Sequence, residues 1–446
     1  MKRRFNLWLP IWLTPRALCL SAGVAALFAL GGAAPAAIAL AYLAAGALAL
    51  ALVADASLGP RARAIAVERE PISHLALRVP ATLGYALTNH ANRLIRFGII
   101  DTPVERLESA QDEVSGDAVA AGVTIIQRTV MPRSRGTIEF GPLYVWYENS
   151  IGLLRRRLRF EAPATARVFP DLSAVERYGS LRARNRLIDA GLRKMRQRGA
   201  GAEFESLREW SAGDAFRAID WKATARRGRV MVAQYEVERS QNVMLVLDAG
   251  RLMTPRLGDQ RKFDYAITAA LSVASIAGLA SDKVGLVAFA REILVAQAPR
   301  ATAASLARLA GQVHDLEPRF EEADYAAAFS YLRAHLHKRS LIVFFTDMVD
   351  PVAQSTMLAE IGTLARRHVV VVAFMNDAAI DDALAAEPQT SLDVYAAGVA
   401  LGLRQERRTA AAVIERLGAR VIDVPAARLN ASLIDEYLRV KQRGLV

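Results

Sequence analysis

The first part of the chain contains a long stretch without a charged side chain, from Ala17 to Ala54. A membrane-spanning helix needs about 20 predominantly apolar residues, with about 25 as the usual upper limit, so this stretch is too long for one span. Near its middle stands Gly31-Gly32-Ala33-Ala34-Pro35, which is a turn signal. We therefore expect two short spanning helices, at about 17–34 and 36–54, that form a transmembrane hairpin.

A secretory signal peptide is the main alternative for this stretch, since basic residues precede it, but the apolar core of a signal peptide covers only about 7–15 residues. Basic residues stand on both sides of the stretch: Lys2, Arg3, Arg4 and Arg16 before it, and Arg61 and Arg63 after it. Because positive charge favours the cytoplasmic side, this pattern predicts an even number of spans. Residues 1–16 are then a basic cytoplasmic tail, and the bulk of the chain is cytoplasmic.

Composition narrows the class of protein further. The 446 residues have a formal net charge of +12 and a mean hydropathy of +0.17, with 23% charged residues, which argues against disorder. One cysteine, Cys19, excludes an intramolecular disulfide. The basic surplus is concentrated in residues 1–16 and 155–198, which argues against binding to a nucleic acid over the whole surface.

Two segments of different character follow the hairpin. Residues 61–170 contain short apolar or β-branched stretches, at 76–79, 123–130, 137–140 and 143–146, separated by Pro, Gly and Asn. This pattern predicts a small antiparallel β-sandwich. Residues 171–240 are expected to contain a basic connector and then a distinctive signature block. Within the connector, 181–198 can form a helix that either packs on its own domain or binds anionic lipid, an acidic partner or RNA.

From residue 241 to 446, strands and helices alternate. Buried strands are expected at 243–247, 284–289, 293–296, 341–345, 369–374 and 420–424, and helices at 263–280, 303–313, 325–336, 352–367 and 404–417. Such a series predicts an α/β open parallel sheet with helices on both faces. Ligands of these sheets bind beyond the carboxyl ends of the strands.

Acidic residues stand at two of those strand ends. Asp248 directly follows one buried strand, and Asp347 follows another after a single Thr. Asp324, just before an expected helix, is a third candidate. Carboxylates at neighbouring strand ends can share a hard cation such as Mg²⁺. The alternative is that these residues cap the helices that follow them, which is a common role of Asp.

Two sets of motifs resemble known families. The first, Asp248-Ala249-Gly250-Arg251-Leu252-Met253 together with Thr346-Asp347-Met348, is similar to the von Willebrand factor type A fold. The second is the block from Glu203 to Arg239, with Trp210, Gly213-Asp214 and Arg217-Ala218-Ile219-Asp220-Trp221-Lys222-Ala223-Thr224-Ala225-Arg226. This block resembles the signature of the bacterial family known as domain of unknown function fifty-eight, and the resemblance extends over essentially the whole chain.

The resemblance implies a function that residue patterns alone do not. Members of this family are membrane-anchored proteins associated with MoxR-type AAA+ ATPases, and they are thought to be adaptors in the assembly of other complexes, without a general enzymatic activity. The implied location is the bacterial inner membrane. A type A domain binds a divalent cation through an Asp-x-Ser-x-Ser motif, a Thr and a further Asp. Here Gly250 and Leu252 replace both serines, and Ala323 lies near the expected Thr, so any Mg²⁺ would be held weakly.

The signature block lacks His and Cys and shows no nucleophile-base spacing, so a catalytic role is not expected. Its members suit a structural or partner-docking role, in which Asp214 or Asp220 pairs with a basic residue and the tryptophans pack on the sheet. The residues concerned are Trp210, Asp214, Arg217, Asp220, Trp221, Lys222 and Arg226.

Three functions are consistent with the sequence. The first is a non-enzymatic, membrane-anchored adaptor that binds a MoxR-type ATPase and needs no cofactor. The second is association with anionic lipid or nucleic acid through residues 155–198. The third is a metal-assisted hydrolase that uses Asp248 and Asp347.

Overall fold

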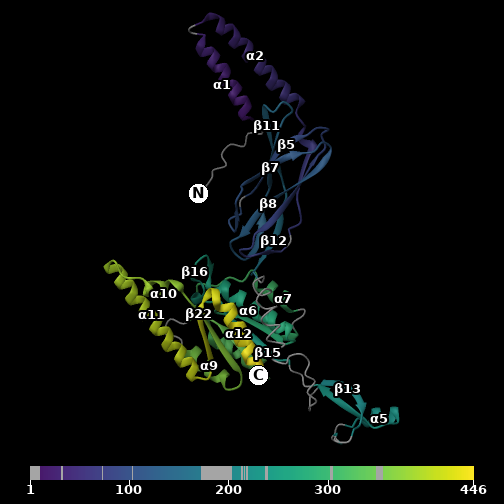
Figure 1. The fold of residues 1–446 in the computed structure, drawn as a ribbon, viewed down its shortest axis with the longest axis vertical. Helices are drawn as coiled ribbons and strands as arrows, with labels where there is room; N and C mark the ends of the chain where they lie inside the picture. Colours follow the sequence, from purple (N-terminus) through teal and green to yellow (C-terminus); the bar gives the residue numbers. More distant parts are fainter. Residues whose placement is uncertain are drawn as a thin grey trace. The chain divides into compact units, whose positions relative to one another are not determined.

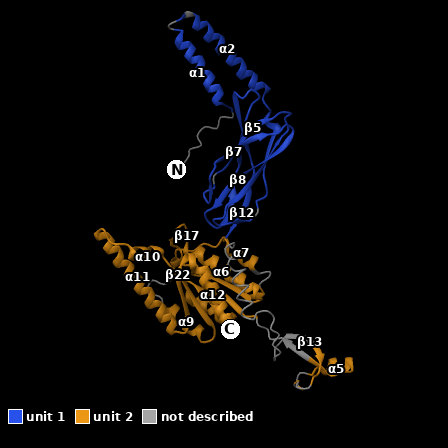
Figure 2. Cartoon of the chain, viewed as in Figure 1, with its two compact units in different colours: residues 1–169 blue, residues 170–446 orange. Residues whose placement is uncertain are grey.

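The computed structural model describes residues 11–446 apart from 32–33, 73, 103, 172–202, 212–213, 215, 217–218, 237–239, 302–304 and 348–354. The chain divides into two compact units, residues 1–169 and residues 170–446, shown in blue and orange in Figure 2. The first unit ends where the sequence predicts the end of the β-rich segment.

Two consecutive apolar helices lie near the start of the first unit, α1 (Pro15–Leu30) and α2 (Pro35–Leu58) (Figure 1). Each begins with proline, whose missing N–H is not needed in a first helical turn. They pack on each other, with the rings of Phe28 and Tyr42 edge to face at 5.2 Å. By length and composition α2 can cross a membrane, whereas α1 is apolar but shorter. Of the two helices, α2 is therefore the one that associates this end of the chain with a membrane.

The rest of the first unit consists of β-strands and one short 3₁₀ helix, η1 (Ala62–Ala64). The strands are β1 (Ile11–Leu13), β2 (Ile65–Arg69), β3 (Leu75–Ala76), β4 (Ala81–Asn89), β5 (Ile95–Asp101), β6 (Leu107–Ser109), β7 (Glu113–Ala118), β8 (Gly122–Pro132), β9 (Gly136–Phe140), β10 (Leu143–Glu148), β11 (Leu154–Phe160) and β12 (Ala164–Phe169). They form sheets of order β1-β11-β10-β5-β7, β2-β4-β8-β6 and β3-β12-β9. One hydrophobic core joins the three sheets and includes the fully buried Tyr85, Phe97 and Tyr147.

Two expectations for this unit are wrong in detail. Residues 11–13 belong not to a free tail but to β1, the edge strand that pairs antiparallel with β11. The strand expected at 76–79 ends at Ala76, because Arg78 has a φ of 63° and the chain turns there. A left-handed residue cannot continue an extended strand.

Both helices are fastened to the sheets by one loop, residues 149–154, which we call the junction loop. Asp55, in the last turns of α2, is fully buried. Its carboxylate accepts hydrogen bonds from the backbone N–H groups of Ile151, Leu153 and Leu154 at 2.6, 2.9 and 2.8 Å. The backbone carbonyl of Asp55 accepts a further bond, from the side-chain amide of Asn149 at 3.0 Å. A carboxylate with three amide donors is a strong, charge-assisted attachment.

The start of α1 is held by the same loop. The N–H of Thr14 donates to the carbonyl of Leu153 at 2.9 Å, and its hydroxyl donates to the carbonyl of Gly152 at 2.8 Å. Thr14 also caps α1 by accepting from the Ala17 N–H. The start of α1 and the end of α2 therefore both bind the junction loop, and this loop fixes the position of the two helices on the β-sheets.

The signature block folds as a small module of its own. Strands β13 (Glu203–Glu209) and β14 (Met231–Glu236) pair antiparallel, and α5 (Trp221–Arg227) lies between them in the chain. The signature part of the expected 171–240 segment thus has strands and a helix of its own. The helix expected at 181–198 lies outside the described residues.

The remainder of the second unit is an α/β sheet. Its strands are β15 (Asn242–Asp248), β18 (Lys283–Phe289), β19 (Ile293–Ala301), β20 (Ser340–Phe345), β21 (Val369–Asn376) and β22 (Arg420–Pro425), with a separate small pair, β16 (Arg256–Leu257) and β17 (Gln260–Arg261). The helices are η4 (Arg251–Met253), α6 (Lys262–Leu279), α7 (Ser305–Val313), α8 (Tyr325–His335), α9 (Ser355–Ala365), α10 (Ala378–Ala385), α11 (Ser391–Arg416) and α12 (Ala426–Gln442).

The order of the six strands is β19-β18-β15-β20-β21-β22. Counted along the chain this is 3-2-1-4-5-6, a doubly wound order that reverses direction beside the first strand, β15. All neighbouring pairs are parallel except β18 and β19. Helices α8, α9 and α11 cover one face through a shared core, and α6 and α12 pack on the other (Figure 1). The predicted open sheet is confirmed, with an antiparallel edge strand added.

Candidate functional site

The two strand-end acids lie side by side. Strands β15 and β20 are parallel neighbours, with Leu247 opposite Phe345, so Asp248 and the Thr346-Asp347 pair emerge together at the carboxyl edge of the sheet. All three residues are buried. The geometry thus brings together the two acids that the sequence singles out, at the switch point of the strand order where α/β sheets bind ligands.

Asp248 is wholly engaged by neighbouring donors. One carboxylate oxygen accepts from the Gly250 N–H at 2.7 Å, and the other accepts from the hydroxyls of Thr346 and Tyr325 at 2.7 and 2.9 Å. Burial raises the pKa of the Asp248 carboxyl above its ordinary value, against the opposing effect of these donors. The Tyr325 pKa is raised as well, by burial and by the carboxylate beside it. Asp248 and its three donors therefore form a closed hydrogen-bonded cluster at the carboxyl edge of the sheet.

Asp347 is held by two internal cations. The Lys262 ammonium, from the start of α6, contacts one oxygen, and the Arg407 guanidinium, from α11, contacts the other at 2.6 Å. Arg407 also pairs with Asp423 of β22 at 2.7 Å. Burial lowers the pKa of Arg407, but the attraction of Asp347 and Asp423 outweighs this and leaves it above its usual value. Positive charge supplied by the chain itself neutralises the carboxylate.

Asp324 does not join these acids. Its carboxylate accepts from the Ala327 N–H at 3.0 Å and caps α8, while its side chain is exposed. The capping alternative is therefore the observed one for Asp324, whereas Asp248 caps no α-helix, and the residues directly after Asp347 lie outside the described ones. The next residue, Tyr325, reaches Asp248 instead. Sequence reasoning missed Tyr325, Lys262 and Arg407, for which the only signal is that α-helices cover the sheet.

Gly250, at the first position where a type A domain has a serine, is also closely covered. A Cβ at Gly250 would lie 3.0 Å from the Ala323 Cβ and 3.1 Å from the Glu321 carbonyl oxygen. Backbone hydrogen bonds hold the segment around Gly250 against residues 319–323. In one of them the Arg251 N–H donates to the Glu321 carbonyl at 2.8 Å. Within the described residues, no group of three or more His, Cys, Asp or Glu is placed to hold a metal ion. The donor set does not fit Mg²⁺, which prefers several free oxygen ligands.

The buried charge of Asp248 leads to a pH prediction. A raised pKa in the folded state means that the folded chain binds the proton more tightly, so this group makes stability fall as pH rises from its ordinary pKa of 3.8. Asp248→Asn removes the charge and keeps the shape. We expect the free energy of unfolding near neutral pH to change by no more than about 1 kcal/mol, and to depend less on pH above about 4. Hydrogen exchange of the β15 and β20 backbone amides at several pH values, corrected for the intrinsic exchange rate, measures this, and a large loss at neutral pH would contradict it.

The signature module has its own ion pair. Asp214 forms a two-pronged contact with Arg208 of β13, with the Arg208 Nη1 at 2.7 Å, and it accepts from the Ser211 N–H. Asp220 caps α5 by accepting from the Ala223 N–H at 2.9 Å. The expected pairing of these acids with Lys222 or Arg226 is wrong, because a partner on the adjoining strand and a helix N-terminus lie closer. Arg217 lies outside the described residues.

The aromatic residues of this module are exposed. The side chains of Phe216 and Trp221 are 76% and 67% exposed, and Trp210 lies on the module surface with its ring 6.3 Å from that of Phe216. The expectation that the tryptophans pack on the sheet is wrong for Trp221. Lys222 and Arg226 are exposed beside it on α5. Large aromatics next to cations are typical of binding surfaces rather than of cores.

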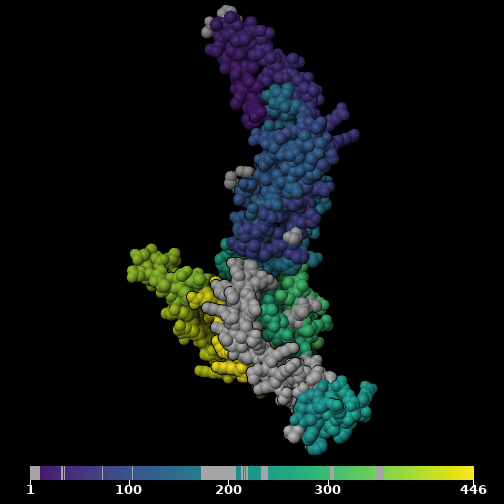
Figure 3. All heavy atoms as spheres, turned by 45° about the vertical axis from the view of Figure 1, so that its right-hand side comes forward, coloured from purple at the N-terminus to yellow at the C-terminus, as the bar shows by residue number. Residues whose placement is uncertain are grey.

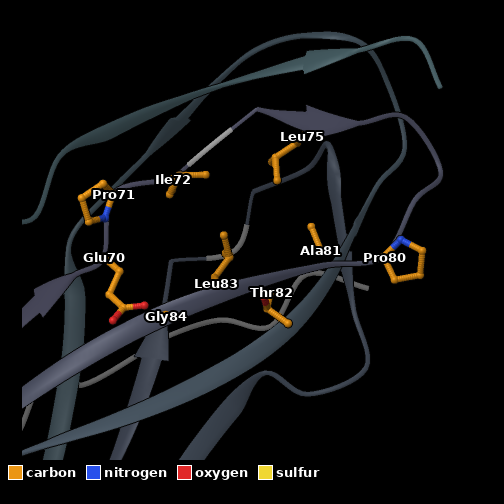
Figure 4. A pocket seen from close by; sticks show the side chains of 9 residues that line it. All are labelled: Glu70, Pro71, Ile72, Leu75, Pro80, Ala81, Thr82, Leu83 and Gly84. Atoms are coloured by element: carbon orange, nitrogen blue, oxygen red, sulfur yellow. The ribbon is translucent and has the colours of Figure 1, made fainter. Parts of the chain in front are cut away.

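A surface pocket of about 320 Å³ lies in the first unit, beside the start of β4 (Figure 4). It is lined by Glu70, Pro71, Ile72, Leu75, Pro80, Ala81, Thr82, Leu83 and Gly84. Glu70 is the one ionisable residue among them and lies over the backbone of Gly84. The pocket offers no second ionisable group for acid-base chemistry and belongs to neither of the two sites described above.

Comparison with known proteins places the signature in a family. Residues 206–384 match the family described as Protein of unknown function DUF58. A segment of 43 residues is 44% identical to Uncharacterized protein YeaD of Bacillus subtilis (strain 168), and covers 10% of this chain and 11% of that protein.

Solved structures are similar to the chain at low identity. The SpRpn10 VWA domain is 12% identical, with a TM-score of 0.29, over 44% of this chain and 95% of that one. The conserved hypothetical protein BatB from Bacteroides thetaiotaomicron is 11% identical, with a TM-score of 0.31, over 45% of this chain and 100% of that one. The family resemblance predicted from the signature block is confirmed by the first comparison: residues 206–384 of this chain match the DUF58 family.

Proposed function

We propose that this protein is a non-enzymatic adaptor, anchored in a membrane by the α1–α2 hairpin, that docks a protein partner through its signature module. The proposed topology has both helices spanning the bilayer and the rest of the chain on the cytoplasmic side of a bacterial inner membrane. The attachment of α2 supports an anchor over a cleaved signal peptide. Cleavage would remove Asp55, whose carboxylate binds three amides of the junction loop.

The carboxylates at the carboxyl edge of the sheet already have partners within the chain, and this supports a role in binding rather than catalysis. A metal-assisted hydrolase needs carboxylate oxygens free for a cation. Here each oxygen of Asp347 meets Lys262 or Arg407, and Asp248 is engaged by three donors. We therefore rank the hydrolase function below the adaptor function, and expect the edge to act without Mg²⁺.

The observation that carries the docking proposal is the exposure of Phe216 and Trp221 in the family signature. Exposed rings of this size are unfavourable in water, and Asp214–Arg208 and the Asp220 cap hold the module together without them. Interface hot spots are enriched in Trp and Arg. The chemistry of the surface, exposed aromatic rings together with Lys222 and Arg226 on the helix of Trp221, fits a partner with an apolar pocket and acidic rim. We propose that this partner is a MoxR-type AAA+ ATPase.

The test is co-purification from detergent extracts of cells that also produce a MoxR-type ATPase, without nucleotide, with ADP and with a non-hydrolysable ATP analogue. We expect wild-type chain to retain the ATPase in at least one state, and Phe216→Ala/Trp221→Ala to retain at least tenfold less, since hot-spot truncations cost about 2 kcal/mol or more. Arg408→Met, an exposed change on α11, is the matched control and should retain it fully. Absence of the ATPase in all three states would reject this partner.

A further inference from the structure

A group of apolar side chains surrounds the outer ends of the two helices. Ile11, Trp12 and Leu13 of the edge strand β1 are 45%, 44% and 44% exposed, and Ile151 of the junction loop is 47% exposed. β1 leads directly into α1 through Thr14, which bonds to the junction loop. These four residues therefore lie close to the start of α1 and to the junction loop that binds the end of α2.

Arginines accompany these apolar residues. The guanidinium of Arg157 lies 5.1 Å from the centre of the Trp12 ring, and Arg16 is exposed in the first turn of α1. The Arg16 guanidinium also approaches Gly152 of the junction loop, since a Cβ there would lie 3.2 Å from its Nη1. Among the described residues neither arginine has an acidic partner, whereas the neighbouring Arg155 pairs with Glu148 at 2.8 Å. We call Ile11, Trp12, Leu13, Arg16, Ile151 and Arg157 the rim.

The length of α1 limits where the boundary of a bilayer can lie relative to the rim. Its 16 residues rise about 24 Å at about 1.5 Å per residue, less than the hydrocarbon core of about 30 Å. A bilayer that contains α1 must therefore bring its boundary up to the residues before the helix. Tryptophan is enriched at this boundary, and basic residues there bind anionic headgroups.

We propose that the rim is a binding surface for anionic phospholipids, with Ile11, Leu13, Ile151 and the Trp12 ring in the interfacial layer and Arg16 and Arg157 on headgroup phosphates. This inference rests on the proposed anchoring of the hairpin. It places the lipid contact on folded residues of β1, β11 and the junction loop, before the stretch at 172–198. A single-stranded nucleic acid also has phosphates and stacking faces, but it offers nothing apolar to the three aliphatic side chains.

The experiment uses the full chain in nanodiscs and one fluorescent label per variant. Native Cys19, exposed on α1, reports anchoring. Ile151→Cys in a Cys19→Ser background reports the rim, and Glu105→Cys in the same background is the control. Glu105 is exposed and follows Asp101, at the end of β5 away from the junction loop. Nitroxide lipids labelled on the acyl chain or on the headgroup serve as quenchers.

We expect the label at Cys19 to be quenched by acyl-chain nitroxides, the label at position 151 by headgroup nitroxides, and the label at position 105 by neither. Nitroxide phosphatidylserine should quench position 151 more than nitroxide phosphatidylcholine does. Each arginine near an anionic surface changes local lipid preference by about fivefold, so Arg16→Gln/Arg157→Gln should bring the two lipids to parity.

The outcomes separate the two proposals. If Cys19 is not quenched, the anchoring itself is rejected. If Cys19 is quenched while position 151 is as weakly quenched as position 105, the anchor stands and the rim is rejected. Equal quenching by both lipids in the wild-type background rejects the anionic preference. Loss of quenching at position 151 on adding a single-stranded oligonucleotide would assign the rim to nucleic acid instead.

Discussion

Replacing Arg407 with methionine is expected to lower the free energy of unfolding of the α/β part by about 3 kcal/mol. The guanidinium and the Asp347 carboxylate are both nearly buried, with side chains 12% and 3% exposed. Removing one member of a buried ion pair costs about 3–5 kcal/mol, because the other charge stays behind without compensation. We expect the lower end of that range, because Lys262 still contacts Asp347.

The measurement is hydrogen exchange of the backbone amides of β20 and β21 in the detergent-solubilised full chain, because a single unfolding midpoint is not well defined for a chain of several units. Arg408→Met is the matched control, because it removes the same charge one position along α11 from an exposed side chain. It should change the free energy of opening, as measured by hydrogen exchange, by less than about 0.5 kcal/mol. Equal effects of the two substitutions would contradict the role of the internal cation.

A further consequence concerns metal. In Lys262→Met/Arg407→Met both oxygens of Asp347 lose their cations and are free for Mg²⁺, while Asp248 on the neighbouring strand stays engaged by its three donors. This variant should recover part of its protection when Mg²⁺ is added, whereas the wild-type chain should show no response to Mg²⁺ or to a chelator. A wild-type response of the same size would mean that the lysine and the arginine do not take the place of a metal.

Asp55→Ala is expected to release the helix pair from the β-sheets. The substitution leaves the N–H groups of Ile151, Leu153 and Leu154 without the carboxylate that they now bind. Each buried donor without a partner costs about 1–3 kcal/mol, so a total loss of about 3 kcal/mol or more is expected. Exchange of these three amides should accelerate by at least about a hundredfold, which corresponds to 2.7 kcal/mol at 1.36 kcal/mol per factor of ten.

Ser57→Ala is the control for this second change. Ser57 lies two residues further along α2, is exposed, and donates its hydroxyl only to carbonyls of its own helix. It should leave the exchange of the junction loop unchanged. If Asp55→Ala also leaves that exchange unchanged, the junction loop is held by other contacts and the rigid attachment of the helices is wrong.

Local patterns predicted most of the elements. The continuous apolar run that ends at Asp248 is a buried strand, as predicted, and the uncharged stretch from Ala17 divides into two helices near its proline. The acids that follow two neighbouring parallel strands lie together, because the carboxyl ends of parallel strands are at the same edge of the sheet. These features depend on neighbours in sequence or on the geometry of a parallel sheet, so one chain is enough to predict them.

The partners of those acids could not be predicted in the same way. Lys262 and Arg407 are 85 and 60 positions away from Asp347, on two different helices. Nothing in their local sequence distinguishes them from the many other basic residues. Asp55 looked like the end of an apolar run, and its role depends on a loop nearly a hundred residues further on. Contacts between distant segments are set by packing, which periodicity does not encode.

The docking role of the signature module is the central claim, and a photo-crosslinking residue at position 221 tests it most directly. Cells would produce the full chain with the crosslinker at Trp221 or, as a control, at Arg408, and adducts would be identified after irradiation of intact membranes. We expect an adduct with an AAA+ ATPase from position 221, none from position 408, and loss of the adduct when Phe216→Ala is added. Absence of any protein adduct at position 221, or equal adducts at both positions, would contradict it.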